Sequence, residues 1–149
     1  AVVPHISIRA RSSGAEKREL KTDTSERDIP LVGVALEAAK RAPKAFEHYR
    51  DRNELFSANI LKAFRKRKLF PTPDHVVYSF RHAFEKRMQE ANIDYALRCL
   101  LMGHKNTRPA YGDGGSLDYR RAELSKIVHP FDASLFHVFD QEHADWWVG

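Results

Sequence analysis

Cysteine is scarce in this chain of 149 residues, which contains only Cys99. A single cysteine excludes an internal disulfide and a zinc site built from several cysteines, and it fits a reducing compartment. Cys99 stands in a largely apolar run, which predicts a buried free thiol. The sequence also lacks an apolar run of the roughly 18 residues that a membrane-spanning helix needs, and no signal peptide is visible. We therefore predict one domain in the cytoplasm, without a membrane partner.

Basic residues are absent from the end of the chain, after Lys126. That end carries the acidic residues Asp132, Asp140, Glu142 and Asp145. Because the formal net charge is +5, residues 1–127 carry about +9 by difference. A basic body with an acidic end indicates either a polyanionic partner or merely a solvated surface, and the sign of the charge does not separate the two.

The first part of the chain has the pattern of a small antiparallel sheet. Apolar and polar residues alternate from His5 to Arg9, as in a half-buried strand. Strand-like segments at residues 19–21 and 28–31 flank a polar, turn-forming run at 22–26. We expect a three-stranded antiparallel sheet with a hairpin whose tip is this polar run.

Five later segments have helical spacing or composition, and most carry a capping residue. The expected helices span residues 34–40, 53–69, 75–91, 95–101 and 117–127; the expected N-caps are Asn53, Asp74, Asp94 and Ser116, and Gly103 is an expected stop. The apolar stripe of the second helix comprises Phe56, Ile60, Leu61 and Phe64. The fold class is therefore α+β and mainly α-helical: a small three-stranded antiparallel sheet near the N-terminus, followed by a helical bundle.

Residues 128–149 form a C-terminal tail in this interpretation, and residues 1–127 form the domain before it. The tail is rich in large apolar side chains, which are hard to leave in water. Two arrangements remain open: the tail docks on a neighbouring subunit, or it folds back on its own domain through Leu135, Phe136 and Phe139. We favour the second slightly.

A basic run closes the second expected helix with Arg65, Lys66, Arg67 and Lys68. Cations in a last turn complement the helix dipole, and they also suit contacts with a phosphate backbone. Both interpretations carry about equal weight. Lys105 is a further candidate for a DNA contact.

Four side chains suited to phosphate chemistry fall between positions 78 and 111. Tyr78 precedes Arg81 by one helical turn, so a phenol and a planar cation share one edge of the expected helix. His104 follows the expected helix stop, and Tyr111 precedes a glycine-rich run at 112–115 that we expect to be flexible. Taken one by one, these are more often a surface arginine, a capping histidine and a turn tyrosine.

Their order along the chain resembles a known family. Residues 79–84 (SFRHAF), 100–107 (LLMGHKNT) and 111–114 (YGDG) are similar to the C-terminal catalytic motifs of tyrosine recombinases of the phage-integrase type. Residues 20–22 (LKT) and 25–31 (SERDIPL) resemble the hairpin of that family, which carries a lysine at this place. The resemblance covers about residues 5–127.

The resemblance implies site-specific DNA recombination or integration without a cofactor or metal. Tyr111 would attack the scissile phosphate and form a 3′-phosphotyrosyl link, while Arg81 and His104 would bind the phosphate oxygens. Lys21 would protonate the departing 5′ oxygen. The implied partners are double-stranded DNA attachment sites and, on DNA, a homotetramer; the implied location is the nucleoid of a bacterial cytoplasm.

Two departures from the family pattern stand out. Tyr78 occupies the place where the family usually has a histidine, and a phenol is a poorer base near neutral pH. The family also has a first arginine upstream of the sheet, and Arg9, Arg11 and Arg52 do not match its context. We expect that arginine to precede Ala1 in a longer protein, and this chain to be inactive alone.

Two alternatives from other classes stay open. The chain could be a non-catalytic DNA-binding module related to integrases, which keeps the basic surface without the full site. It could also be a helical protein-interaction domain whose basic residues form a solvated face. Steeply salt-dependent DNA binding would exclude the second alternative.

Overall fold

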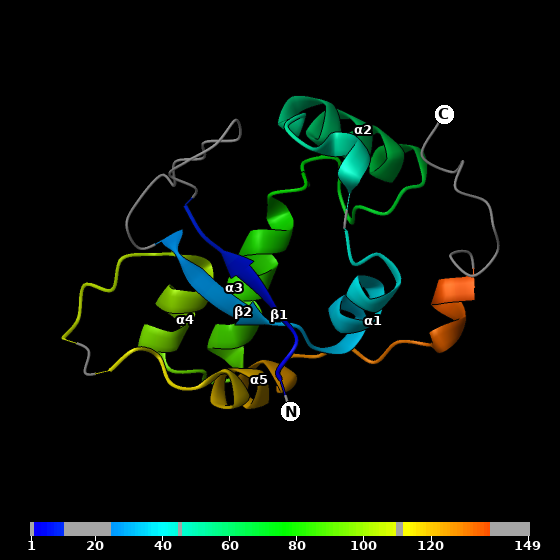
Figure 1. The fold of residues 1–149 in the computed structure, drawn as a ribbon. Helices are drawn as coiled ribbons and strands as arrows, with labels where there is room; N and C mark the ends of the chain where they lie inside the picture. Colours follow the sequence, from blue (N-terminus) through cyan, green and yellow to red (C-terminus); the bar gives the residue numbers. More distant parts are fainter. Residues whose placement is uncertain (1, 11–24, 45, 110–111, 138–149) are drawn as a thin grey trace.

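The computed structural model describes residues 2–10, 25–44, 46–109 and 112–137. This part of the chain is mainly helical, with one small antiparallel sheet (Figure 1). In order, its elements are β1 (His5–Ile8), β2 (Arg27–Pro30), α1 (Gly33–Arg41), η2 (Glu47–Tyr49), α2 (Asn53–Lys66), α3 (Ser79–Glu90), α4 (Tyr95–Met102), α5 (Leu117–Ser125) and η3 (Ala133–Phe136). The prediction of a mainly helical chain with a small antiparallel sheet is confirmed.

Strands β1 and β2 pair antiparallel, with His5 opposite Pro30 and Ile8 opposite Arg27. The backbone N–H of Leu31 donates to the Pro4 carbonyl at 2.9 Å and extends this pairing by one bond. The third expected strand, at residues 19–21, lies outside the described residues, as does most of the hairpin tip. The described sheet therefore has two strands.

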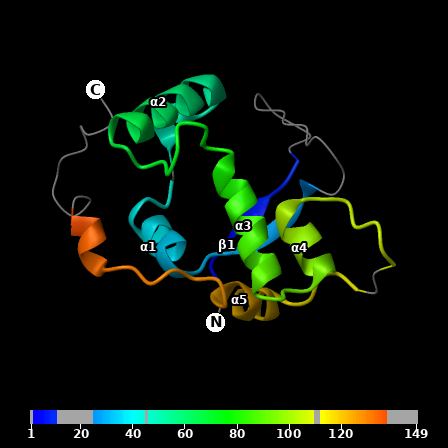
Figure 2. The same ribbon diagram turned by 180° about the vertical axis from the view of Figure 1, so that it is seen from behind.

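Helices α3, α4 and α5 form the core together with β2. The α3 helix lies behind the strands in Figure 1 and in front of them in Figure 2. The buried side chains of this core are Met88, Ile93, Leu97, Leu101, Met102 and Leu124, and Ile29, Phe84 and Ile127 are among those that pack against them. Because each fully buried side chain of this size contributes about 1.5–3 kcal/mol, this cluster is the main source of stability on this side of the molecule.

The two ends of α4 are capped as expected. The carboxylate of Asp94 accepts hydrogen bonds from the backbone N–H groups of Ala96 and Leu97, at 2.8 and 3.2 Å. Gly103 ends the helix in the left-handed conformation, with a φ of 67°. At the start of α5, the hydroxyl of Ser116 accepts from the N–H of Tyr119 at 3.2 Å, which confirms a third predicted cap. Cys99 is a buried free thiol, also as expected.

Two other predicted caps are wrong. Asn53 is the first residue of α2, and the position before the helix is Arg52, which makes no side-chain capping bond. The α3 helix begins at Ser79 and not at His75, so Asp74 does not cap it. The side chain of Ser79 accepts from the backbone N–H of Val76 at 3.1 Å. A separate turn precedes the helix, in which the Val76 carbonyl also accepts from the backbone N–H of Ser79 at 2.9 Å.

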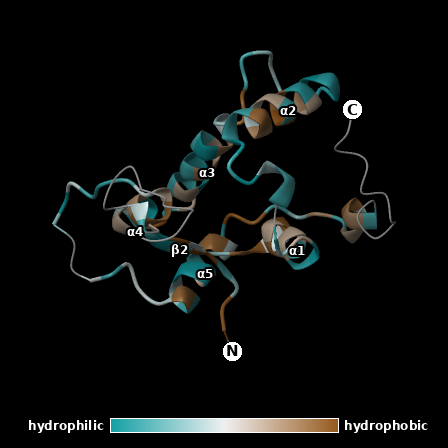
Figure 3. Cartoon of the chain, turned by 45° about the horizontal axis from the view of Figure 1, so that its top comes forward, coloured by the Kyte–Doolittle hydropathy of each residue, from teal (hydrophilic) through white to brown (hydrophobic). Residues whose placement is uncertain are grey.

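The α2 helix is joined to its surroundings mainly by aromatic rings. No residue of α2 is fully buried. The ring of Phe56 packs on Phe46 and Tyr49, with centroids 5.2 and 5.3 Å apart, and Phe64 packs on Phe80 at 5.9 Å. The predicted apolar stripe is thus half-buried, and Figure 3 shows hydrophobic and hydrophilic residues alternating along α2.

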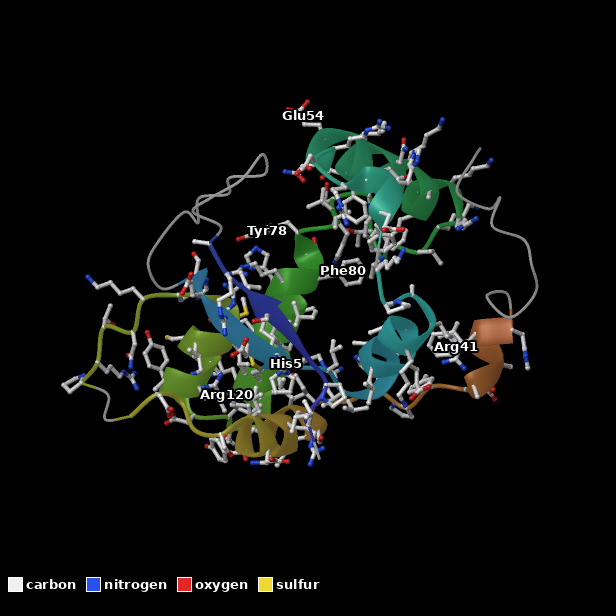
Figure 4. The ribbon with its side chains drawn as sticks, in the orientation of Figure 1. His5, Arg41, Glu54, Tyr78, Phe80 and Arg120 are labelled. Carbon is white, nitrogen blue, oxygen red and sulfur yellow. The ribbon has the colours of Figure 1, made fainter. Side chains whose placement is uncertain are left out.

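The described part of the tail folds back on α1. Phe136 is only 3% exposed, and the guanidinium of Arg41 lies 4.4 Å from the centre of its ring (Figure 4). Leu135, by contrast, is 57% exposed. Phe139 lies outside the described residues. Among the described residues, no helix is long and apolar enough to cross a membrane.

Candidate functional site

Arg81 and His104 meet at the C-terminal end of α4, although they are 23 residues apart in the sequence. The guanidinium Nη2 of Arg81 donates a hydrogen bond to the Met102 carbonyl and lies 3.0 Å from His104 Nε2. Arg81 belongs to the first turn of α3, so the pair joins the beginning of one helix to the end of the next. Two of the expected site residues are therefore neighbours.

The turn after α4 places His104. The backbone N–H of His104 donates to the Cys99 carbonyl at 2.8 Å, and Gly103 supplies the left-handed residue that this tight turn needs. An arginine can only donate, so His104 Nε2 accepts in this pair. In the tautomer that this hydrogen bond requires, the ring N–H is at Nδ1. His104 is exposed, which leaves that N–H as a donor for a ligand.

Arg27, at the beginning of β2, is a third member of this cluster. Its Nε donates to the Leu101 carbonyl at 3.1 Å, and its Nη1 donates to the Ser25 carbonyl at 2.6 Å. Burial and, second, the nearby positive charge of Arg81 lower the pKa of Arg27 below its ordinary value. No role was predicted for Arg27 from the sequence. Its spacing of two from Ile29 could have indicated that it faces the core, because alternate residues of a strand share a face and Ile29 packs on the core.

The cluster is positively charged and lacks a counter-ion within the described part of the chain. Neither Arg27 nor Arg81 forms an ion pair with any described carboxylate; their hydrogen-bond acceptors are backbone carbonyls and His104. The negative end of the α4 dipole offsets part of the repulsion between the two cations. A site with two guanidiniums and an imidazole N–H favours an anion with several oxygens, of which phosphate is the common biological example.

Tyr78 stands at the N-cap position of α3 and is 60% exposed. Its ring packs edge-on against His82, with centroids 5.2 Å apart. Figure 4 shows Tyr78 and Phe80 leaving the start of α3 on different sides. Among the described residues, Tyr78 forms no hydrogen bond and no ring contact with Arg81 or His104, so the role predicted for Tyr78 stays a prediction.

Lys21 and Tyr111, the expected acid and nucleophile, lie outside the described residues. The glycine-rich run after Tyr111 is described from Gly112 onward, and its expected flexibility stays a prediction. Three of its glycines adopt positive φ angles, between 78° and 103°. A side chain at Gly114 would lie 2.4 Å from Leu100. Gly114 and Gly115 therefore lack room for a side chain, whereas a Cβ at Gly112 would meet nothing within 4 Å.

Arg120 of α5 holds this turn in place (Figure 4). Its guanidinium donates to the carbonyls of Asp113 at 2.8 Å, Gly114 at 3.2 Å and Asp28 at 3.3 Å. The last of these belongs to β2, so Arg120 connects the turn to the same strand that begins with Arg27. The turn after Tyr111 and the Arg27–Arg81–His104 cluster are thus both attached to β2.

The predicted DNA-contacting residues Arg65, Lys66, Arg67, Lys68 and Lys105 are all exposed. The first two lie in the last turn of α2, Arg67 is its C-cap, and Lys68 follows with a φ of 54°. None of the five forms an ion pair with a described carboxylate. The contact between Phe64 and Phe80 connects this basic end of α2 to the residue before Arg81.

A separate hollow of about 540 Å³ lies beside η2 and the start of α2, lined in part by Phe46, Tyr49 and Phe56. It contains none of the predicted site residues. The described residues also include no group of three or more His, Cys, Asp or Glu side chains arranged to hold a metal ion. The arginine–histidine cluster is therefore the candidate functional site.

Comparisons with protein-family models, curated proteins and solved structures find no match to this chain. The class of the site consequently rests on its own residues. These define a partly exposed, cationic cluster at a helix end, built from two arginines and a histidine.

Proposed function

We propose that this chain is the catalytic part of a DNA recombinase or integrase that cuts and rejoins DNA through a 3′-phosphotyrosyl intermediate. The observation that carries the proposal is the contact between Arg81 Nη2 and His104 Nε2. These are the residues to which the resemblance assigns the phosphate oxygens, and they come from separate motifs. Next to this pair, the guanidinium of Arg27 forms no ion pair with any described carboxylate, so the cluster keeps an excess of positive charge.

In the proposed reaction, the Tyr111 oxygen forms a bond to the scissile phosphorus while the bond to the 5′ oxygen breaks. Lys21 donates the proton that the leaving 5′-hydroxyl needs, and the tyrosine proton passes to a base or solvent. Rejoining is the reverse attack by a 5′-hydroxyl on the phosphotyrosyl link. No oxidant, reductant or nucleotide cofactor is consumed, because one phosphodiester is exchanged for another.

Arg81 and His104 would stabilise the charge that grows on the non-bridging oxygens. Arg81 uses Nη2 for the Met102 carbonyl and His104, which leaves its Nη1 and Nε donors for phosphate. Loss of one such donor typically costs about 3–4 kcal/mol of transition-state stabilisation. Tyrosine has a pKa of about 10 in water, so nearby cations also help it to react near neutral pH.

The DNA duplex would be held by cations outside the cluster. We assign backbone contacts to Arg65, Lys66, Arg67 and Lys68 at the end of α2, and to Lys105 beside His104. Their exposure and their lack of described carboxylate partners support this assignment. Attachment-site DNA and a homotetramer assembled on it are the partners that belong to this proposal.

Trapping a covalent adduct tests the proposal. The full-length protein is incubated with a nicked DNA substrate that carries its attachment site, and denaturing electrophoresis reports protein joined to DNA. Wild type should form the adduct, and Tyr111→Phe should bind the same DNA without forming it. An adduct that persists in Tyr111→Phe would remove Tyr111 as the nucleophile.

The same experiment separates the alternatives. Salt-sensitive DNA binding without an adduct from the wild type would indicate a non-catalytic DNA-binding module. Absence of DNA binding would favour a protein-interaction domain. For Tyr78, substitution by His should preserve or raise the cleavage rate, and an unchanged rate in Tyr78→Ala would assign it a structural role.

A further inference from the structure

Arg27 connects two distant parts of the chain at the edge of the candidate site. Its Nε donates to Leu101, 74 residues away at the end of α4, while its Nη1 donates to Ser25, two residues before it. Ser25 is the first described residue after the segment that contains Lys21. One guanidinium thus joins the residues just before β2 to the helix end that places His104.

The shape of the guanidinium suits this connection. Its N–H groups lie in one rigid plane, so a bond to the strand side fixes the direction of the bond to the helix side. Gly103 lies directly against this group: a Cβ at position 103 would stand 2.6 Å from Arg27 Nη1 and 2.8 Å from its Cζ. The turn that carries His104 therefore packs on Arg27 without room for a side chain between them.

Arg27 and Arg81 donate to consecutive carbonyls of the same helix end. Leu101 accepts from Arg27, and Met102 accepts from Arg81. Two like charges repel each other, so this arrangement persists only because the carbonyls hold both groups. A shift of the α4 end would move both acceptors, and with them Arg81 and His104.

We propose that Arg27 is a positioning residue, which sets the placement of Arg81 and His104 through the end of α4. This inference rests on the proposed recombinase function. Two of the three nitrogens of Arg27 already donate to carbonyls, so its effect on the scissile phosphate passes through Arg81 and His104. A misplacement of about 1 Å in such a site can cost about a hundredfold in rate.

The test compares Arg27→Ala and Arg27→Lys with the control variant Arg9→Ala. Arg9 follows β1, and its guanidinium pairs with the carboxylate of Asp28. Its removal takes away one positive charge near the same sheet and removes no hydrogen bond to α4. Two quantities are measured in the full-length protein: the single-turnover rate of adduct formation at saturating DNA, and the slope of duplex affinity against salt concentration.

We expect Arg27→Ala to slow adduct formation about a hundredfold while the salt slope stays at the wild-type value. Arg27→Lys keeps the charge and loses the planar fork, so it should also be slowed. Arg9→Ala should react at the wild-type rate. A wild-type rate in Arg27→Ala would overturn the proposal, and a salt slope reduced by about one would overturn it too, because that result marks a direct phosphate contact.

A second measurement does not depend on cleavage. The ¹⁵N shifts of the His104 imidazole report whether Nε2 accepts a hydrogen bond, and His104→Gln identifies the signal. In folded Arg27→Lys, loss of the bond from Arg81 should shift the Nε2 resonance; an unchanged resonance contradicts the inference even if Arg27→Ala does not fold. Failure of the proposed function would show separately, as a wild-type protein that forms no adduct or an adduct that survives Tyr111→Phe.

Discussion

The α3–α4–α5 region and the α2 region are built from similar helices but are held in different ways. The first encloses a continuous set of buried side chains, among them Met88, Leu97 and Leu101. The second has no buried residue and is attached through pairs of half-exposed aromatic rings. The candidate site lies in the first region, where packing fixes the helix ends, while the basic run at 65–68 lies at the end of α2. The candidate site and this basic run thus belong to differently packed parts of the chain.

The largest expected difference is in the response to a cavity. Leu101→Ala removes a side chain that is 1% exposed, and we expect a loss of about 2–5 kcal/mol in the free energy of unfolding. The matched change Leu61→Ala, in the half-buried stripe of α2, should cost about 1 kcal/mol. Urea denaturation followed by circular dichroism measures both. Equal losses would show that α2 is packed as tightly as α4.

A smaller effect is expected at the helix starts. Asp94→Ala removes two hydrogen bonds to the first turn of α4 and should cost about 1 kcal/mol. Asn53→Ala changes the first residue of α2, which makes no capping bond, so stability should stay the same or rise by a few tenths of a kcal/mol. Thermal unfolding of the two variants gives the comparison. A clear destabilisation by Asn53→Ala would assign a capping role to that side chain.

The smallest effect is expected in the pH dependence of stability at low pH, through Asp28 of the sheet that packs on the first region. Asp28 accepts from the Ser7 hydroxyl at 2.6 Å and from Arg9 at 2.7 Å, and these bonds, that of Ser7 first, lower its pKa below the ordinary value. A carboxyl with a lowered pKa in the folded state stabilises the protein above its unfolded pKa, and this contribution is lost as the pH falls through the folded pKa.

Asp28→Asn should therefore flatten the dependence of stability on pH below about 4, with little change in its slope near neutrality. Urea denaturation at a series of pH values measures this dependence. As a control, Asp118→Asn alters an exposed carboxylate that pairs with Arg121 on α5. If the stability of Asp28→Asn falls with decreasing pH as steeply as that of the wild type, the result would contradict a lowered pKa at Asp28.

Local signals explain which elements were predictable. The caps at Asp94, Gly103 and Ser116 act on backbone groups within one turn, so residue type and spacing are enough to place them. The start of α3 lies later than predicted, at Ser79, and follows a turn in which Val76 and Ser79 are hydrogen-bonded to each other. The sequence did not predict the packing around Gly114, which lies against Leu100 of α4 and whose carbonyl accepts from Arg120 of α5.

By itself, the sequence determined the mainly helical class and the ends of α4, because these depend on short-range spacing. The family resemblance of ordered motifs predicted that Arg81 and His104 act together. Only the tertiary structure decided that the two side chains lie 3.0 Å apart and that Arg27 is bound to the same helix end. The physical reason is distance along the chain. The bond from Arg27 to Leu101 exists because β2 and α4 pack against one core, and no local pattern of residues records that packing.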